Sequence, residues 1–129
     1  MSKLKRLLLS IPAIAVALMI FILSNGPMPE LPTFGIVWED KILHVSAYST
    51  FGISLILFLF ANFKNFKLFK YAYITLAIGA FYGITDEFHQ LFIPTRTSDI
   101  YDWMADVIGI SLSIIFIKLI KNKIIKEVN

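Results

Sequence analysis

The chain has no cysteine and little charge. Without cysteine, its 129 residues can form neither disulfides nor thiolate metal sites, and no cysteine nucleophile is available. Charged residues make up only 16% of the sequence, whereas hydrophobic residues make up 57%. This composition is far too apolar for an ordinary soluble domain, and the length leaves room for one domain. The sequence therefore predicts a single membrane-embedded domain over residues 1–129.

Four apolar segments are each close to the length that a helix needs to cross a bilayer. They cover residues 7–23, 42–61, 71 to about 92, and 100–117. About 20 helical residues span ~30 Å of hydrocarbon. The first segment follows three cations but has Ile22, Leu23 and Ser24 where a signal peptide would carry a small-x-small cleavage motif, so we interpret it as a retained anchor. The fold predicted is all-α, an integral membrane bundle of four transmembrane helices.

Positive charges are concentrated at three places on one side of such a bundle. Ten of the 12 Lys and Arg residues stand at the N-terminus, between the second and third segments, or at the C-terminus. They are Lys3, Lys5, Arg6, Lys64, Lys67, Lys70, Lys118, Lys121, Lys123 and Lys126. Every acidic residue except Glu127 lies toward the other side. Because cytoplasmic segments carry the excess of Lys and Arg, the predicted topology is N-in and C-in.

The positions of these cations also indicate which partners the protein can have. A pI near 9.2 is compatible with nucleic-acid binding, but these cations are topology signals and a contact surface for anionic membrane lipid, so no nucleic-acid partner is predicted. Residues 25–39, with three prolines, are expected to form an irregular external loop, and residues 62–70 a short interfacial segment. Pro94 and Thr95 mark the outer turn before the last helix. Small residues are expected where helices touch, at Gly52, Gly79, Gly83 and Gly109.

Polar residues recur at helical spacing near the outer ends of three segments. Those that share a face are Asp40, Lys41, His44 and Tyr48 on the second helix, Tyr82, Asp86, His89 and Gln90 on the third, and Asp99, Asp102 and Asp106 at the start of the fourth. Glu87 lies about 100° around the helix from Asp86. Arg96, in the preceding turn, can fold back over the acids. The three faces are predicted to converge just below the outer membrane surface, where ionisable groups are normally paired and functional.

Each group also has a purely structural interpretation. Asp40 and Lys41 could simply be charges that end a helix. Asp86 with His89 is the strongest functional pair, because a carboxylate one turn from an imidazole can fix its tautomer and raise its basicity. Arg96 could form a structural ion pair with Asp99 or Asp102, or bind a phosphate. Asp106 must have a partner, for which the candidates are Arg96, Lys41 or a histidine.

Three ordered motifs resemble the VanZ-like family of small bacterial membrane proteins. They are Asp40-Lys41-x-x-His44-x-x-x-Tyr48, then Tyr82-Gly83-x-x-Asp86-Glu87-x-His89-Gln90-x-Phe92-x-Pro94-x-Arg96, then Asp102-Trp103-x-x-Asp106-x-x-Gly109. The resemblance covers about residues 36–117. It departs at Asp106, where many relatives carry asparagine. Because the namesake is associated with teicoplanin resistance, the resemblance implies a bacterial, multi-pass protein of the cytoplasmic membrane linked to the cell envelope and to antibiotic resistance.

Two mechanisms remain open. In the first, Asp86, Glu87, His89 and His44 are catalytic: His89 is a general base oriented by Asp86, or a metal ligand together with His44, and Glu87 is a second acid or base. Oxygen and nitrogen ligands would suit a divalent metal such as zinc or manganese. A lipid or a lipid-linked cell-wall precursor would then be held by Arg96, Lys41, Tyr48, Tyr82, Gln90, Asp40, Asp102 and Asp106.

In the second mechanism nothing is turned over. The polar pocket binds an amphiphile such as a lipoglycopeptide, or it is a buried ion-pair network that gives the protein its shape. A proton-coupled carrier is a third variant, which would need a homo-oligomer because a chain of this length makes a narrow bundle.

Overall fold

The computed structural model describes residues 2–27 and 38–128, with side chains described as far as Leu119. It contains four helices: α1 (Lys3–Ser24), α2 (Glu39–Asn62), α3 (Leu68–Gln90) and α4 (Ile100–Val128). All four are long and apolar enough to cross a membrane, α4 over Ile100–Leu119. The prediction of an all-α chain with four membrane-spanning helices is confirmed.

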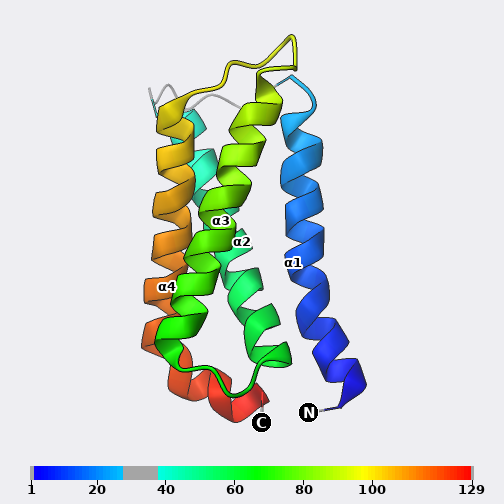
Figure 1. Cartoon of the computed structure of the whole chain (residues 1–129), viewed down its shortest axis with the longest axis vertical. Helices are drawn as coiled ribbons and strands as arrows, with labels where there is room; N and C mark the ends of the chain where they lie inside the picture. Colours follow the sequence, from blue (N-terminus) through cyan, green and yellow to red (C-terminus); the bar gives the residue numbers. More distant parts are fainter. Residues whose placement is uncertain (1, 28–37, 129) are drawn as a thin grey trace.

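The helices form a bundle in which neighbours along the chain run in opposite directions (Figure 1). Both chain ends and the α2–α3 connection lie at one end of the bundle, and the α3–α4 connection lies at the other. α2 contacts all three other helices and packs most extensively on α4. The polar faces predicted on the second and fourth helices are therefore brought together by the largest helix–helix contact among the described residues.

The helix boundaries differ from the predicted ones at the connections. α3 begins at Leu68, inside the segment predicted to be interfacial, because Lys67 adopts an extended conformation and accepts the first helical bond, from Lys70 N at 2.8 Å. It ends at Gln90 rather than near residue 92. There Phe92 N and Ile93 N bond three residues back, and Pro94, which has no N–H, follows. The predicted external loop at residues 25–39 falls mostly outside the described residues.

Glycines set the spacing between α4 and its neighbours, as predicted. A Cβ atom on Gly109 would lie 2.5 Å from the Val45 carbonyl oxygen of α2, and one on Gly52 would collide with Ser113 of α4. On α3, the absence of a side chain at Gly79 leaves room for Ile110 of α4, and at Gly83 it leaves room for Asp106. Ser49 uses the proximity to donate to the Gly109 carbonyl at 3.0 Å. Small residues let helix backbones approach closely where apolar solvent provides no hydrophobic driving force.

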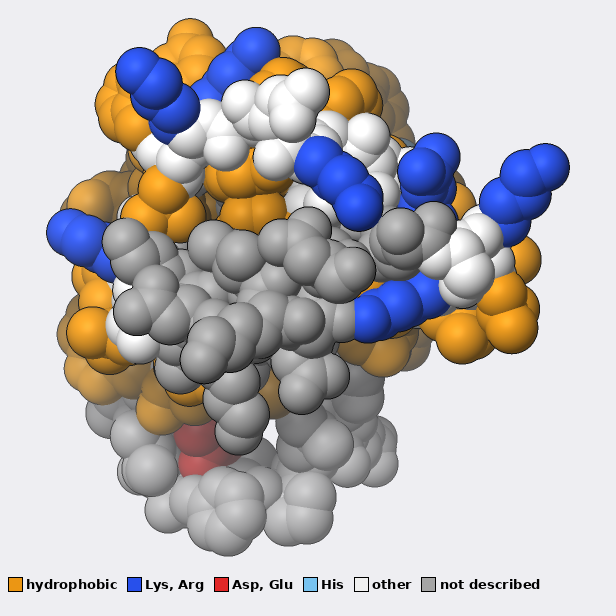
Figure 2. Space-filling model, turned by 90° about the horizontal axis from the view of Figure 1, so that it is seen from below, with side chains coloured by type: hydrophobic (Ala, Val, Ile, Leu, Met, Phe, Trp, Pro, Cys, Tyr) orange, Lys and Arg blue, Asp and Glu red, His pale blue; other side chains and the backbone are white. Residues whose placement is uncertain are grey.

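The two ends of the bundle differ in charge. Seen from the end that holds the termini, the described Lys and Arg side chains are spread around its rim (Figure 2). The described Lys and Arg residues at this end belong to the start of α1, to the α2–α3 connection and the first turn of α3, and to α4 at Lys118. Between the ends, large apolar side chains cover the outer surface, and Phe81 and Leu119 are 68% and 79% exposed. Such a surface is expected where the surrounding solvent is lipid.

Candidate functional site

The opposite end of the bundle contains an ionic cluster built on Lys41. Its ammonium group lies 3.2 Å from Asp40 Oδ2 and 2.9 Å from Asp99 Oδ2, and it also donates to Asp102 Oδ1. Asp40 precedes Lys41 on α2. Asp99 lies directly before α4, and Asp102 lies in the first turn of α4. We call these four residues the Lys41 cluster. It joins α2 to α4 at their site-facing ends, as the predicted convergence requires.

Asp99 lies just outside the membrane-spanning part of α4. The hydrogen bond that it accepts from Lys41, together with one from the Tyr101 backbone N–H, lowers the pKa of its carboxyl group below the ordinary value. Asp99 is therefore an ionised partner of Lys41 at neutral pH.

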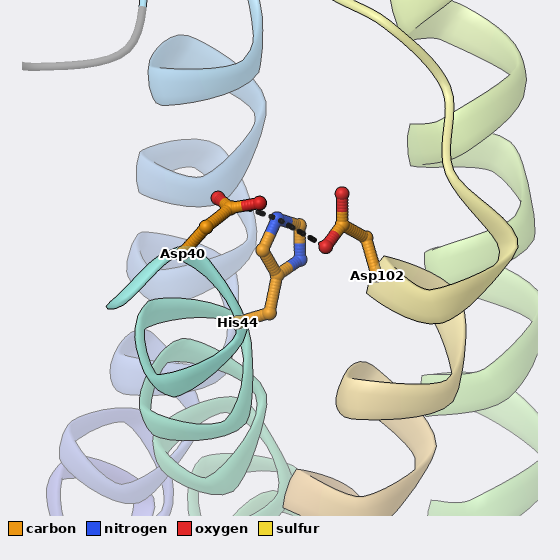
Figure 3. Close-up of side chains that lie close together, drawn as sticks. All are labelled: Asp40, His44 and Asp102. Atoms are coloured by element: carbon orange, nitrogen blue, oxygen red, sulfur yellow. Dashed lines mark ion pairs between the residues drawn. The ribbon is translucent and has the colours of Figure 1, made fainter. Parts of the chain in front are cut away.

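His44 lies one turn below this cluster and connects it to a deeper carboxylate. Its Nε2 atom is 3.9 Å from Asp40 Oδ1 and 4.0 Å from Asp102 Oδ1, so that the ring stands between the two acids (Figure 3). Its Nδ1 atom is 2.8 Å from Asp106 Oδ1. Asp106 is fully buried. Of the three partners predicted for Asp106, the structure selects a histidine, and that histidine is His44.

Glu87 brings α3 into the same site. Its Oε2 atom accepts a 2.8 Å hydrogen bond from Asp99 N, while Oε1 is buried without a partner among the described residues. Asp106 Oδ2 is in the same situation. Ligating atoms of His44, Glu87 and Asp106 lie within 4.8 Å of one another, and so do those of Asp40, His44 and Asp102. Either set has the donor atoms to hold a divalent metal ion.

Asp86 and His89 do not form the predicted pair. Asp86 Oδ1 accepts from Ser24 Oγ of α1 at 2.5 Å, and its Oδ2 accepts weakly from Gln90 at 3.4 Å. His89 Nε2 is instead 2.8 Å from Asn25 Oδ1. One helical turn brings Asp86 and His89 within reach of each other, but both side chains turn to the polar end of α1. The histidine that a carboxylate orients in this structure is His44.

The contacts of Asn25 also fix the role of His89. Because Asn25 Nδ2 donates to the Phe21 carbonyl at 2.7 Å, its Oδ1 is the acceptor for His89. His89 Nε2 therefore carries the hydrogen. The ring also packs against Phe21, with centroids 5.2 Å apart. His89 is thus part of the seam between α1 and α3.

Arg96 is also placed differently from the prediction. It does not pair with Asp99 or Asp102 but reaches the end of α1, where Nη2 donates to the Leu23 carbonyl at 2.7 Å and Nε donates to the Gly26 carbonyl at 2.8 Å. The last carbonyls of a helix have no partner within it, so this is a favourable use of a guanidinium group. Arg96 therefore ties the α3–α4 connection to α1.

Two tyrosines of the predicted site lie deeper. The Tyr82 hydroxyl donates to the Ala17 carbonyl of α1 at 2.7 Å, which adds a third contact between α1 and the rest of the site. Tyr48 is 1% exposed, and its hydroxyl has no hydrogen-bond partner among the described residues. Its ring packs against both the Phe51 and the Tyr82 rings, which also contact each other. Tyr82 thus has a structural contact, and Tyr48 offers an unused hydroxyl.

A cavity of about 450 Å³ opens between α1 and α2 at this end. Its walls are mostly apolar, and its polar groups come from all sides of the site. The lining residues are Ile20, Leu23, Ser24, Asp40, Leu43, His44, Ser46, Ala47, Tyr48, Thr50, Asp86, Gln90 and Arg96. His44 belongs both to this wall and to the buried carboxylate network, so the cavity gives access to the network.

Ser24 and Asn25 were not among the predicted site residues. They are small, uncharged and at the end of the most apolar segment, so neither spacing nor charge singled them out. Their position along the chain, directly at the end of the first apolar segment, could have identified them. α1 must end at the same level as the polar starts of α2 and α4, and the first polar residues after it are therefore placed to meet Asp86 and His89.

Comparison with known proteins gives one match. A family model described as VanZ/LLP1 matches residues 8–121. No curated protein and no solved structure matches. The matched range contains all four candidate spans except the first five residues of α1, and every residue of the site.

Proposed function

The chain belongs to the VanZ/LLP1 family and is a multi-pass membrane protein, and on that basis we propose that it binds a membrane amphiphile of the cell envelope in the cavity between α1 and α2. The observation that carries the proposal is the composition of this cavity. Apolar side chains such as Ile20, Leu43 and Ala47 provide most of its exposed surface, and polar groups from α1, α2, α3 and the α3–α4 connection also line it. Ligand sites commonly combine such walls with a few polar groups that fix orientation.

Charge selects the part of the site that would hold the headgroup. Lys41 is engaged with three carboxylates, so it is not available to a ligand anion. Arg96 is the other cation of the site. It lines the cavity beside Ser24 and Gln90 and uses Nε and Nη2 on backbone carbonyls. We expect a phosphate or carboxylate of the amphiphile to lie near Arg96, away from the acids of α4.

The charge asymmetry of the bundle supports a location in the outer leaflet. The basic end, with both termini, would face the cytoplasm under the positive-inside rule, and the site would then face outward. In a bacterial cytoplasmic membrane this is where lipid-linked cell-wall precursors and lipoglycopeptides are met. A role in teicoplanin-type resistance would follow from binding one of these amphiphiles.

A catalytic function has one observation of its own. His44 is hydrogen-bonded through Nδ1 to the buried Asp106 and also lines the cavity. A carboxylate-held imidazole beside a bound lipid could act as general base in hydrolysis or group transfer. In that case His44→Gln would leave the lipid bound but unconverted, and wild-type cells would contain a product that is missing from cells with the variant.

The test is to identify the lipids that remain with the purified protein. The protein is extracted in polymer-bounded membrane discs, and bound lipids are compared with the bulk membrane by mass spectrometry. Ala47→Trp fills the cavity, whereas Ile42→Trp places the same ring on an exposed face of α2. We expect one amphiphile to be enriched with the wild type and with Ile42→Trp, and to fall about tenfold with Ala47→Trp, which corresponds to ~1.4 kcal/mol. Equal lipid content in all three samples would exclude the cavity as the binding site.

A further inference from the structure

Two buried carboxylate oxygens of the site have no hydrogen-bond partner in the part of the chain that the structure describes. Asp106 is fully buried and Glu87 is 7% exposed, yet Asp106 Oδ2 and Glu87 Oε1 have no hydrogen-bond partner among the described residues. Asp106 Oδ2 is directed at the face of α3 that carries Gly83, where an added Cβ atom would be 2.9 Å away, and Glu87 lies one turn further along that face. Leaving such atoms unsatisfied is strongly unfavourable, because each has lost its hydration.

The charge balance of the site indicates what is missing. Its residues include six carboxyl groups but only two permanent cations, Lys41 and Arg96. Lys41 contacts Asp40, Asp99 and Asp102. Arg96 donates to backbone carbonyls rather than to acids. Asp86 accepts a hydrogen bond from the Ser24 hydroxyl. Glu87 and Asp106, which come from two different helices, are the acids that each keep one buried oxygen without a partner among the described residues.

We propose that His44, Glu87 and Asp106 form a binding site for a divalent metal ion. Each residue supplies one ligand atom, and the three atoms already lie within 4.8 Å of one another. Around a tetrahedral ion with bonds of about 2.0–2.2 Å, such atoms are separated by roughly 3.5 Å, so binding would draw the three atoms closer together. The ion would take up the two unpartnered oxygens and join α2, α3 and α4 at one point.

The second set of possible ligands, Asp40, His44 and Asp102, is a poorer site. Lys41 already donates to both of its carboxylates, so a metal ion there would be repelled by an ammonium group bonded to its own ligands. These residues are also nearer the surface, since the Asp40 side chain is 32% exposed. The Lys41 ammonium group thus disfavours a metal ion at the outer set, and the deeper set of His44, Glu87 and Asp106 is the better cation site.

The ligand set favours a first-row transition metal over magnesium or calcium. Imidazole nitrogen is a good ligand for zinc and related ions, whereas Mg²⁺ and Ca²⁺ prefer oxygen ligands throughout. Three protein ligands leave a coordination position open. Because His44 also lines the cavity, that position could be reached by a polar group of a molecule bound there. The metal site itself requires no amphiphile, so it can exist whether or not the proposed function is correct.

Metal content of the intact protein tests the proposal. The protein in membrane discs is stripped with a chelator, equilibrated separately with Zn²⁺ or Mn²⁺, desalted and measured by elemental mass spectrometry, with Mg²⁺ as the comparison. We expect about one equivalent of Zn²⁺ or Mn²⁺ and at least a tenfold weaker affinity in Glu87→Gln and in His44→Gln. Asp40→Asn, which alters only the outer set, should keep the full equivalent.

Substoichiometric metal in the wild type would overturn the proposal, and so would a Glu87→Gln protein that binds as well as the wild type. Loss of metal in Asp40→Asn with retention in Glu87→Gln would also overturn it in favour of the outer residues. A variant could lose metal because it fails to fold, so the wild-type protein is also loaded with Co²⁺. The visible absorption bands of Co²⁺ report its ligation directly and require no substitution. Ala47→Trp should bind metal normally, so failure of the cavity proposal and failure of the metal proposal give different results.

Discussion

The polar side chains on the two sides of the site, between α2 and α4 and between α1 and α3, are held by different kinds of contact. On the α2–α4 side, Lys41 contacts three carboxylates and His44 contacts Asp106, so the side chains that meet there are ionisable on both helices. On the α1–α3 side, Asp86, His89 and Arg96 are held by a hydroxyl, an amide and backbone carbonyls of α1. Each bond there joins at most one charged group. The comparison shows that α4 is fastened to α2 by ion pairs, while α1, which forms one wall of the cavity, is fastened by weaker single bonds.

Removing the central cation should give the largest effect. Lys41→Met leaves Asp40, Asp99 and Asp102 close together without their common partner, and Asp102 is 5% exposed. Breaking a fully buried pair destabilises a protein by about 3–5 kcal/mol. Because the Lys41 side chain is 21% exposed, we expect a loss at the lower end of that range, about 3 kcal/mol. Thermal unfolding in detergent should show a correspondingly large fall in midpoint. Lys64→Met, which removes an exposed lysine at the other end, is the control, and equal midpoints for the two variants would show that the Lys41 cluster contributes nothing to stability.

A smaller loss should follow from forcing α2 and α4 apart. In Gly109→Ala the new methyl group would press on the Val45 carbonyl, which is backbone and cannot turn away. Overpacking of this kind costs about 1–3 kcal/mol. The matched control is Gly26→Ala, since a Cβ atom at Gly26 meets nothing within 4 Å. If the two alanine variants unfold at the same temperature, the close approach of α2 and α4 does not need glycine.

The smallest effect is expected on the α1–α3 side. Asn25→Ala removes the amide between His89 and the end of α1, a neutral hydrogen bond worth about 0.5–1.5 kcal/mol. The same readout, with exposed Asn65→Ala as control, should show a shift well below that of Lys41→Met. A loss as large as that of Lys41→Met would reverse the comparison and make α1 the more firmly held helix.

The sequence predicted the helices and the meeting of the polar faces of α2 and α4, because both follow from periodicity. Their spacing along the helix places Lys41 and His44 on one face. In a four-helix bundle surrounded by lipid, such a polar face is expected to contact the other polar residues, here Asp102 and Asp106. The same reasoning failed for His89. Spacing allowed a bond to Asp86, but the actual partner, Asn25, depends on how α1 is rotated and at what height it ends. An apolar helix surrounded by lipid carries little sequence information about either.

Arg96 on the end of α1 has a consequence for how the protein is made. The Leu23 and Gly26 carbonyls leave the ribosome about seventy residues before the side chain that caps them. During synthesis α1 can enter the membrane, and α2 can follow, while this end is still satisfied only by water and headgroups. The cavity wall is therefore completed only after the third helix has been inserted and its connection to the fourth has turned back across the membrane surface. Release of the nascent chain before that point would give a protein with its first helices in the membrane but with the cavity incomplete.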